Sequence, residues 1–250
     1  MSTPLSSPVA CVGTAGWAVP VSATARGTHL QRYARVLRGV EINSSFYRPH
    51  APATYERWAS ATPPEFRFAV KVPRSISHDQ RLTGTRDLLA RFLDETAGLG
   101  TRRGPLLLQL PPSFGYDART VGRFLALLRR RYEGTVVVEP RHASWFASPA
   151  EALLTSYRAA RVGADPAVVD GAAAPAAWPG VCYFRLHGSP RIYWSSYTPE
   201  ALTRVLVQLR HAMVSGAEAW CIFDNTAGGA AYPNARVVHQ RLARGLRRTA

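Results

Sequence analysis

The sequence predicts a single α/β domain over residues 1–250, of the (β/α)₈ TIM-barrel class. Three observations favour it: eight short apolar runs, segments of helical periodicity between them, and a repeat of roughly 30 residues. The chain has 250 residues, of which 46% are hydrophobic, and this is enough for one large core. A doubly wound open sheet would also alternate, but it usually has fewer strands, and no G-x-G-x-x-G follows the first run.

Each predicted strand ends in glycine, proline or a polar residue. The clearest run is Val136-Val137-Val138 before Glu139-Pro140, and the weakest ends at Asp165-Pro166. In order, the strands are 9–12, 40–42, 66–70, 106–110, 136–138, 161–164, 181–186 and 219–223.

Helical periodicity fills most of the intervening segments, and the helix after 198 has the clearest start, with Thr198 as cap and Pro199 in its first turn. Residues 170–180 are mostly Ala, Pro and Gly, so the sixth β/α unit is predicted to be irregular. The predicted helices are 29–37, 54–61, 86–99, 118–131, 150–160, 199–213 and 234–246.

The sequence favours a cytoplasmic protein that does not enter a membrane. Residues 1–8 are expected to be a flexible start without a charged or apolar signal region, residues 245–250 a basic tail, and no run is long enough to cross a bilayer. Cys11, Cys182 and Cys221 each lie in an apolar run without a C-x-x-C pair, which is typical of buried thiols in a reducing compartment.

The net charge of +15 favours anionic partners, either a small molecule such as a phosphorylated metabolite or a nucleic acid. The alternative is an arginine-rich background, since residues 129–131 end a predicted helix and such runs are commonly solvated. Among the 31 basic residues only Lys71 is a lysine. A desolvated lysine can lose its proton near neutral pH whereas arginine cannot, so Lys71 is a candidate for proton transfer, imine formation or phosphate contact. The alternative is an exposed lysine without a functional role.

In a TIM barrel the active-site residues lie at the carboxyl ends of the strands. Here those strand ends carry polar groups, which we expect to lie together at one end of the barrel. Arg185 and His187 share a face by the two-residue period of a strand. We predict catalytic roles for Lys71, Glu41, Glu139, His187 and Asp165. We predict substrate binding by Arg141, Arg185, Asn43, Tyr47, Trp17, Asp224, Asn225 and Tyr197.

Two interpretations of the carboxylates stay open. Glu41 and Glu139 would act as acid and base, or with Asp165 and Asp224 as oxygen ligands of a divalent metal; alternatively, arginines hold each carboxylate in a structural ion pair. Metal-ligand spacing such as H-E-x-x-H is missing from the sequence, so the cofactor is unknown, and a divalent metal is allowed but not indicated.

Several separately spaced motifs resemble the YecE-like family, labelled domain of unknown function seventy-two. The motifs are Gly13-x-x-Gly16-Trp17, Glu41-x-Asn43-x-x-Phe46-Tyr47, Phe66-x-Phe68-x-x-Lys71, Gln109-Leu110-Pro111-Pro112-x-Phe114, Glu139-Pro140-Arg141-His142-x-Ser144-Trp145, Arg185-Leu186-His187-Gly188 and Phe223-Asp224-Asn225. The resemblance runs from about residue 12 to 235 and implies a TIM barrel without an established activity, loosely similar to the xylose isomerase and endonuclease IV barrels. The sequence departs from the family at Ala15, where serine is common, and at Trp194, in a stretch that usually carries glycine.

Two function classes follow. The first is an enzyme acting on a phosphorylated sugar, nucleotide or nucleic acid by acid/base catalysis, as a hydrolase, isomerase or lyase. The second is a binding protein without turnover that holds nucleic acid or a nucleotide through its basic rim and loop aromatics. Polar groups at nearly every strand end favour the enzyme, and the sequence leaves the reaction, the metal and the oligomeric state open.

Overall fold

The computed structural model describes residues 10–18 and 26–246. The predicted flexible start at 1–8 lies outside the described residues, as do residue 9 of the first predicted strand and residues 247–250 of the predicted basic tail.

All eight predicted strand regions form strands, which pair into two sheets. The four-stranded sheet has the order β1 (Ala10–Thr14), β10 (Glu218–Phe223), β9 (Val181–Leu186), β7 (Gly163–Asp165). The six-stranded sheet has the order β2 (Gly39–Ile42), β3 (Arg67–Lys71), β4 (Arg103–Gln109), β5 (Val136–Glu139), β6 (Ala159–Arg161), β8 (Ala176–Ala177). Every pair is parallel except β6 with the short β8.

The two sheets meet at both ends. Ala15 forms an isolated parallel bridge with Glu41, and the Gly16 amide donates to the Glu41 carbonyl at 2.9 Å. The absence of a side chain at Gly13 allows β1 and β2 to come this close, because a Cβ on Gly13 would collide with the carbonyl oxygen of Gly39 in β2. At the other end the sixth predicted strand divides at Val162 into β6 and β7, one in each sheet. The pairing among the described residues therefore gives two sheets, and it does not form one closed barrel.

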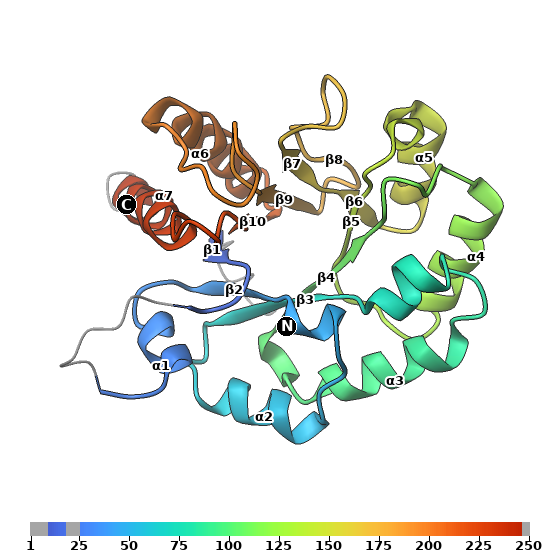
Figure 1. Ribbon diagram of the computed structural model, residues 1–250, viewed down its shortest axis with the longest axis horizontal. Coiled ribbons are helices and arrows are strands. Elements are labelled where there is room, and N and C mark those ends of the chain that lie inside the picture. The colour runs from blue at the N-terminus through green and yellow to red at the C-terminus, as the bar shows by residue number, and fades with distance from the viewer. Residues whose placement is uncertain (1–9, 19–25, 247–250) are drawn as a thin grey trace, which may run out of the picture.

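Helices cover the outer side of the strands (Figure 1). They are α1 (His29–Ala34), α2 (Pro52–Ser60), α3 (Arg86–Ala97), α4 (Ala118–Arg129), α5 (Ser148–Ser156), α6 (Pro199–Val214) and α7 (Ala231–Leu246), with short turns η1 (Ser44–Phe46), η2 (Ser75–Asp79), η3 (Gly100–Arg102) and η4 (Ala143–Phe146). The predicted cap of α6 is confirmed, because the Thr198 hydroxyl accepts from the Ala201 amide. The predicted irregular unit is present too, since residues 166–180 contain β8 and turns but no helix.

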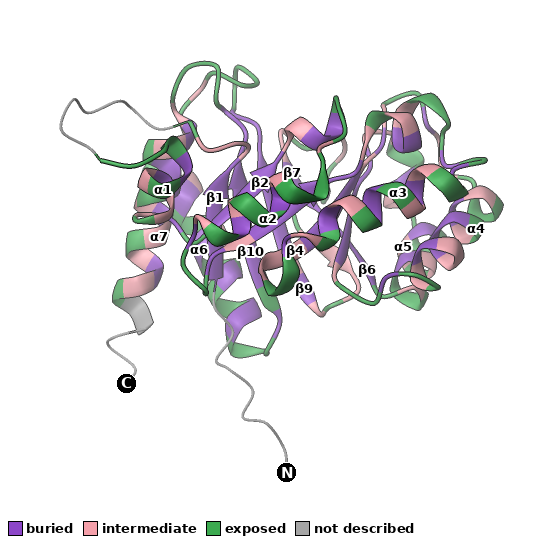
Figure 2. Cartoon of the chain, turned by 90° about the horizontal axis from the view of Figure 1, so that it is seen from below, coloured by how far each residue is buried: buried purple, intermediate pink, exposed green. Residues whose placement is uncertain are grey.

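Side chains on the strands alternate between two apolar layers, and most strand residues are buried (Figure 2). The outer layer packs against the helices and includes Val40, Val70 and Val138. The inner layer is shared by both sheets and consists of Cys11, Ala69, Leu107, Val137, Ala160, Val162, Ala164, Val181, Tyr183, Trp220 and Ile222. Continuing the inner series by two residues along β3, β5, β9 and β10 leads to Lys71, Glu139, Arg185 and Asp224.

Candidate functional site

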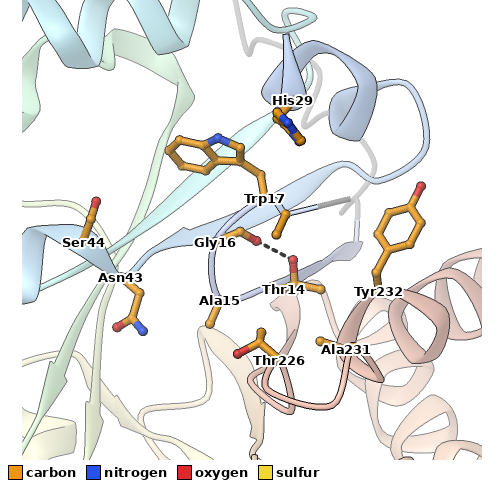
Figure 3. Close-up of a pocket in the computed structure, with 12 residues that line it drawn as sticks. Thr14, Ala15, Gly16, Trp17, His29, Asn43, Ser44, Thr226, Ala231 and Tyr232 are labelled. Carbon is orange, nitrogen blue, oxygen red and sulfur yellow. Dashed lines mark hydrogen bonds between the residues drawn. The ribbon is translucent and has the colours of Figure 1, made fainter. Parts of the chain in front are cut away.

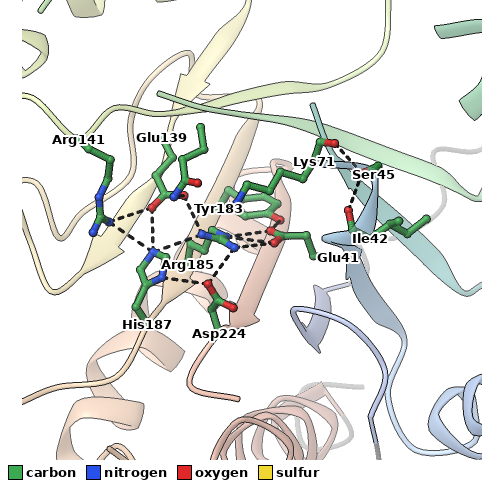
Figure 4. A network of polar contacts seen from close by, with 11 residues as sticks. Glu41, Ile42, Ser45, Lys71, Glu139, Arg141, Tyr183, Arg185, His187 and Asp224 are labelled. Carbon is green, nitrogen blue, oxygen red and sulfur yellow. Dashed lines mark hydrogen bonds and ion pairs between the residues drawn. The ribbon is translucent and has the colours of Figure 1, made fainter. Parts of the chain in front are cut away.

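Arg185 lies at the centre of a buried polar cluster, which we call the Arg185 network: Glu41, Glu139, Arg141, Tyr183, Arg185, His187 and Asp224 (Figure 4). Its Nη2 lies 2.8 Å from Glu41 Oε1 and 3.0 Å from Asp224 Oδ2, and its Nη1 lies 3.1 Å from Glu139 Oε2. The Arg185 side chain is 1% exposed and both glutamates are fully buried. One guanidinium therefore binds carboxylates from three strands across both sheets.

His187 is held between two carboxylates of the Arg185 network. Its Nε2 lies 2.8 Å from Glu139 Oε1 and its Nδ1 lies 3.1 Å from Asp224 Oδ2. A carboxylate can only accept, so both ring nitrogens satisfy their contacts when both are protonated. Burial alone lowers the pKa of His187, but the Glu139 charge and the two hydrogen bonds outweigh it and raise that pKa above its usual value.

The same contacts keep Glu139 and Asp224 ionised. Burial disfavours the charge on Glu139, yet Arg185, His187 and Arg141 hold its pKa far below the usual range. Asp224 behaves likewise, with Arg185 and the His187 hydrogen bond lowering its pKa against the effect of burial. The Arg141 guanidinium lies 3.0 Å from Glu139 Oε1 and is 19% exposed. The three carboxylates are thus balanced by Arg141, Arg185 and a protonated His187.

Lys71 lies next to the Arg185 network and adds a cation to the charged groups that already balance there (Figure 4). It ends β3 on the inner side, is 5% exposed, and its Nζ lies 4.1 Å from the centroid of the Phe46 ring. Within residues 10–18 and 26–246, no ion pair or hydrogen bond reaches Nζ. Burial and the nearby Arg185 charge lower the pKa of Lys71 to about 8, although the carboxylates act in the opposite direction. The amino group therefore exchanges its proton close to neutral pH.

The predicted catalytic residue Asp165 is kept away from this cluster. Asp165 lines a separate cavity of about 450 Å³ with Tyr197 and residues of α6. Strand alternation explains its position: Val162 and Ala164 face the inner layer, so Asp165 faces outward. The structure therefore does not bring Asp165 to the other predicted catalytic residues.

Two further predicted binding residues make structural contacts. The Tyr197 hydroxyl accepts from the Gly188 amide at 2.8 Å and donates to the Asp165 carbonyl at 3.3 Å. Asn225 is fully buried, and its Nδ2 donates to the Ser195 carbonyl and to Asn234 Oδ1. Both residues thereby fix the loop between β9 and α6.

The remaining predicted residues lie around the strand ends. Trp17 and Asn43 line a cavity of about 810 Å³ at the carboxyl ends of β1, β2 and β10 (Figure 3). Tyr47 is 73% exposed.

Sequence reasoning assigned no role to Tyr183 or Phe46. The Tyr183 hydroxyl donates to Glu41 Oε2 at 3.1 Å, and Phe46 underlies the Lys71 amino group. Tyr183 precedes Arg185 by two residues, so the strand period was the signal that places it on the same face.

The acidic groups of the site are already occupied by protein cations. In the described part of the chain, no group of three or more His, Cys, Asp or Glu side chains has an arrangement that would hold a metal ion. None of the helices described there is both long and apolar enough to cross a membrane.

The family assignment follows from comparisons with known proteins. The family model described as "Protein of unknown function DUF72" matches residues 11–249. The UPF0759 protein YecE of Escherichia coli O157:H7 is 31% identical over 169 residues, which covers 67% of this chain and 61% of YecE. The UPF0759 protein YunF of Bacillus subtilis (strain 168) is 26% identical over 148 residues, or 55% of this chain and 52% of YunF. The aligned segments thus span about half to three-fifths of these relatives.

Solved structures show the same fold. A DUF72 family protein of Enterococcus faecalis V583 matches with a TM-score of 0.79 at 21% identity, covering 94% of this chain and 95% of the other. A DUF72 family protein of Thermotoga maritima MSB8 matches with a TM-score of 0.77 at 24% identity, covering 94% and 99%. The expected resemblance is confirmed, and the chain belongs to the DUF72 family.

Proposed function

We propose that this protein is an enzyme that binds an anionic substrate at the carboxyl ends of its strands, with Lys71 as the group that gives and takes a proton. The observation that carries the proposal is the Lys71 amino group, which is buried, has a pKa of about 8, and lies beside a network whose charges already balance without it. The resemblance to YecE supports the family and leaves the reaction to experiment.

Charge balance supports an anionic substrate. Three carboxylates face Arg141, Arg185 and a protonated His187, so a protonated Lys71 leaves the site with one excess positive charge. An anion bound against Lys71 and the partly exposed Arg141 would neutralise that excess without breaking an existing pair. Phosphate esters and carboxylates meet this requirement.

Proton transfer is assigned to Lys71 rather than to the carboxylates. General acid/base catalysis works best when the pKa of the group lies near the working pH. The pKa of Glu139 is far too low for an effective base at neutral pH. In this proposal Glu41 and Glu139 position Arg185 and His187, and they do not exchange protons with the substrate.

We further propose that the two sheets together act as one (β/α)₈ barrel, with β6 and β7 as halves of the sixth strand. The Ala15–Glu41 bridge at one junction and the single residue between β6 and β7 at the other support this arrangement. A reducing, cytoplasmic setting is part of the proposal, supported by the three free cysteines.

A specific observation also favours the alternative, a nucleic-acid binding protein without turnover. Tyr193 and Trp194 in the loop after β9 are 46% and 47% exposed, and the Arg191 guanidinium lies 4.5 Å from the Trp194 ring centroid. Exposed aromatic rings beside arginine are the groups on which unpaired bases stack. This function predicts binding that weakens steeply with salt and is unaffected by Lys71→Arg.

The two functions are separated by one set of variants. Wild type, Lys71→Arg, Lys71→Met and a surface control, Arg210→Met, are incubated with a panel of phosphorylated sugars and nucleotides, and products are followed by phosphorus NMR. We expect wild type and Arg210→Met to convert at least one compound and both Lys71 variants to lose at least 100-fold in rate. Undiminished turnover by Lys71→Arg would contradict the proton-transfer role, and salt-sensitive binding of single-stranded RNA without any turnover would favour the alternative.

A further inference from the structure

A cavity of about 810 Å³ opens at the carboxyl ends of β1, β2 and β10 (Figure 3). Its lining residues Asn43 and Thr226 each lie two residues beyond a member of the Arg185 network, and none of the lining residues belongs to that network. Its volume is within the usual range for small-molecule sites, roughly 300–1,000 Å³. Its walls come from the end of β1 and the residues after it, the start of α1, the turn after β2, the loop between β10 and α7, and the start of α7. The aromatic side chains on these walls are those of Trp17, His29 and Tyr232.

The aromatic walls are held in place from behind. The Trp17 ring packs edge-on against Trp58, with 5.0 Å between centroids, and Tyr232 packs on Tyr33 at 6.2 Å. Gly16 and Gly229 also line the cavity, both have positive φ, and a Cβ on either would meet no atom within 4 Å. A flat ring can therefore contact fixed aromatic surfaces and approach bare backbone.

The register of β2 and β3 connects this cavity to Lys71. Ile42 is paired with Val70, so Asn43 and Lys71 are the next residues along neighbouring strands. Neighbouring strands lie about 4.8 Å apart. Asn43 lines the cavity and Lys71 belongs to the network side, so one molecule of ordinary size can contact both.

Asn43 offers an unused hydrogen-bonding group at this junction. Its Oδ1 has almost no exposed surface and no hydrogen-bond partner, so a ligand in the cavity reaches it once the amide turns toward the cavity; among the described residues no side-chain hydrogen bond of Asn43 opposes that turn. An asparagine amide accepts from and donates to the N6 amino group and N7 of adenine as a matched pair. The unpaired oxygen therefore points to a ligand that brings a donor, and a flat heteroaromatic base does so between aromatic walls.

We infer that the substrate is a nucleotide-like anion whose heteroaromatic base occupies the cavity between Trp17 and Tyr232, with its edge on Asn43 and its phosphate at Lys71 and Arg141. This inference rests on the proposed function for the phosphate end, and it adds the chemical class of the remainder. It also explains why a cavity with aromatic walls adjoins a charged site.

The test measures affinity by calorimetry for adenosine 5′-monophosphate, adenosine, ribose 5-phosphate and inorganic phosphate. The variants are Asn43→Leu, Tyr232→Ala and Lys71→Met, with Tyr157→Ala as control because Tyr157 is a half-buried tyrosine at the opposite end of the strands. We expect adenosine 5′-monophosphate to bind wild type at least tenfold more tightly than ribose 5-phosphate does. Asn43→Leu and Tyr232→Ala are expected to remove that tenfold difference and leave ribose 5-phosphate affinity unchanged, and Tyr157→Ala to change neither.

The outcomes separate the two claims. If both phosphates bind in a Lys71-dependent manner but the base adds no affinity, the nucleotide inference is overturned and the proposed anion site stands. If adenosine and its monophosphate bind equally, depend on Asn43 and ignore Lys71→Met, the base site is supported and the proposed role of Lys71 is overturned. Asn43→Leu keeps the test valid should Tyr232→Ala fail to fold.

Discussion

Arg185 and Glu41 form a two-pronged ion pair inside the protein, with Arg185 Nη2 2.8 Å from Glu41 Oε1 and Arg185 Nε 3.1 Å from Glu41 Oε2. The two residues come from different sheets, so the pair joins the halves of the fold at the level of the candidate site. Buried pairs of this kind stabilise little relative to apolar residues, but removing one partner is costly because it strands a charge.

Arg185→Met is therefore expected to destabilise the protein strongly. The substitution removes the cation that Glu41, Glu139 and Asp224 share. An unpaired buried charge lowers the free energy of unfolding by about 3–5 kcal/mol. Urea unfolding followed by circular dichroism measures the change. Arg141→Met serves as the matched control, since Glu139 is the one carboxylate of the Arg185 network that Arg141 contacts, and Arg141 is partly exposed. Equal losses in the two variants would show that Arg185 is not the centre of the network.

Arg141→Met is expected to weaken anion binding more than it weakens the fold. Glu139 keeps Arg185 and His187 as partners, so the loss in unfolding free energy should be about 1 kcal/mol or less. Phosphate affinity should fall roughly tenfold, since a charge-assisted contact is lost. Calorimetric titration with inorganic phosphate checks this. Unchanged affinity would remove Arg141 from the proposed anion site.

Lys71→Met is expected to stabilise the protein near neutral pH. Burial and Arg185 lower the pKa of Lys71 from 10.5 to about 8, and each pKa unit corresponds to about 1.4 kcal/mol, so the gain is about 3 kcal/mol. The penalty for the buried cation is complete below pH 8, shrinks as the folded protein loses this proton, and is gone above the unfolded pKa of 10.5. Urea unfolding between pH 7 and 10.5 should show the gap between variant and wild type closing. A gap that grows with pH would contradict the lowered pKa.

His187→Asn is expected to destabilise the protein, most strongly at low pH. The pKa of His187 is raised in the folded protein, so its contribution to stability is complete below the unfolded pKa of about 6.5 and is lost as pH rises through the folded pKa. The difference in unfolding free energy between wild type and His187→Asn should therefore be largest near pH 6 and smaller at pH 8. Because Lys71 is present in both proteins, its own titration cancels in the comparison. A difference that increases with pH would mean that His187 is neutral in the fold.

The two-residue period of strands made much of the site predictable. Arg185 and His187 were expected to share a face, and both lie in the network. The same period also places Asp165 outward once Val162 and Ala164 are known to face the inner layer, but short alanine-rich strands show too little polar alternation to fix this from sequence.

Contacts across the fold were not predictable. Which arginine pairs with which carboxylate depends on distances between strands of different sheets, and the Lys71 contact with Phe46 depends on the η1 turn. The cavity beside Asn43 joins residues 14–18 to residues 226–232, and no pattern along the chain records that proximity. The division of the sixth strand at Val162 likewise depends on which neighbour each half finds.

The pKa of Lys71 tests the account most directly, and the composition makes the measurement simple. Since the chain contains one lysine, protein labelled with ¹³Cε-lysine gives a single side-chain signal for NMR titration. We expect a midpoint near pH 8 that rises when inorganic phosphate is added, since a bound anion favours the charged amine. A midpoint at the ordinary value of 10.5, unaffected by phosphate, would contradict both the desolvated amine and the anion site built around it.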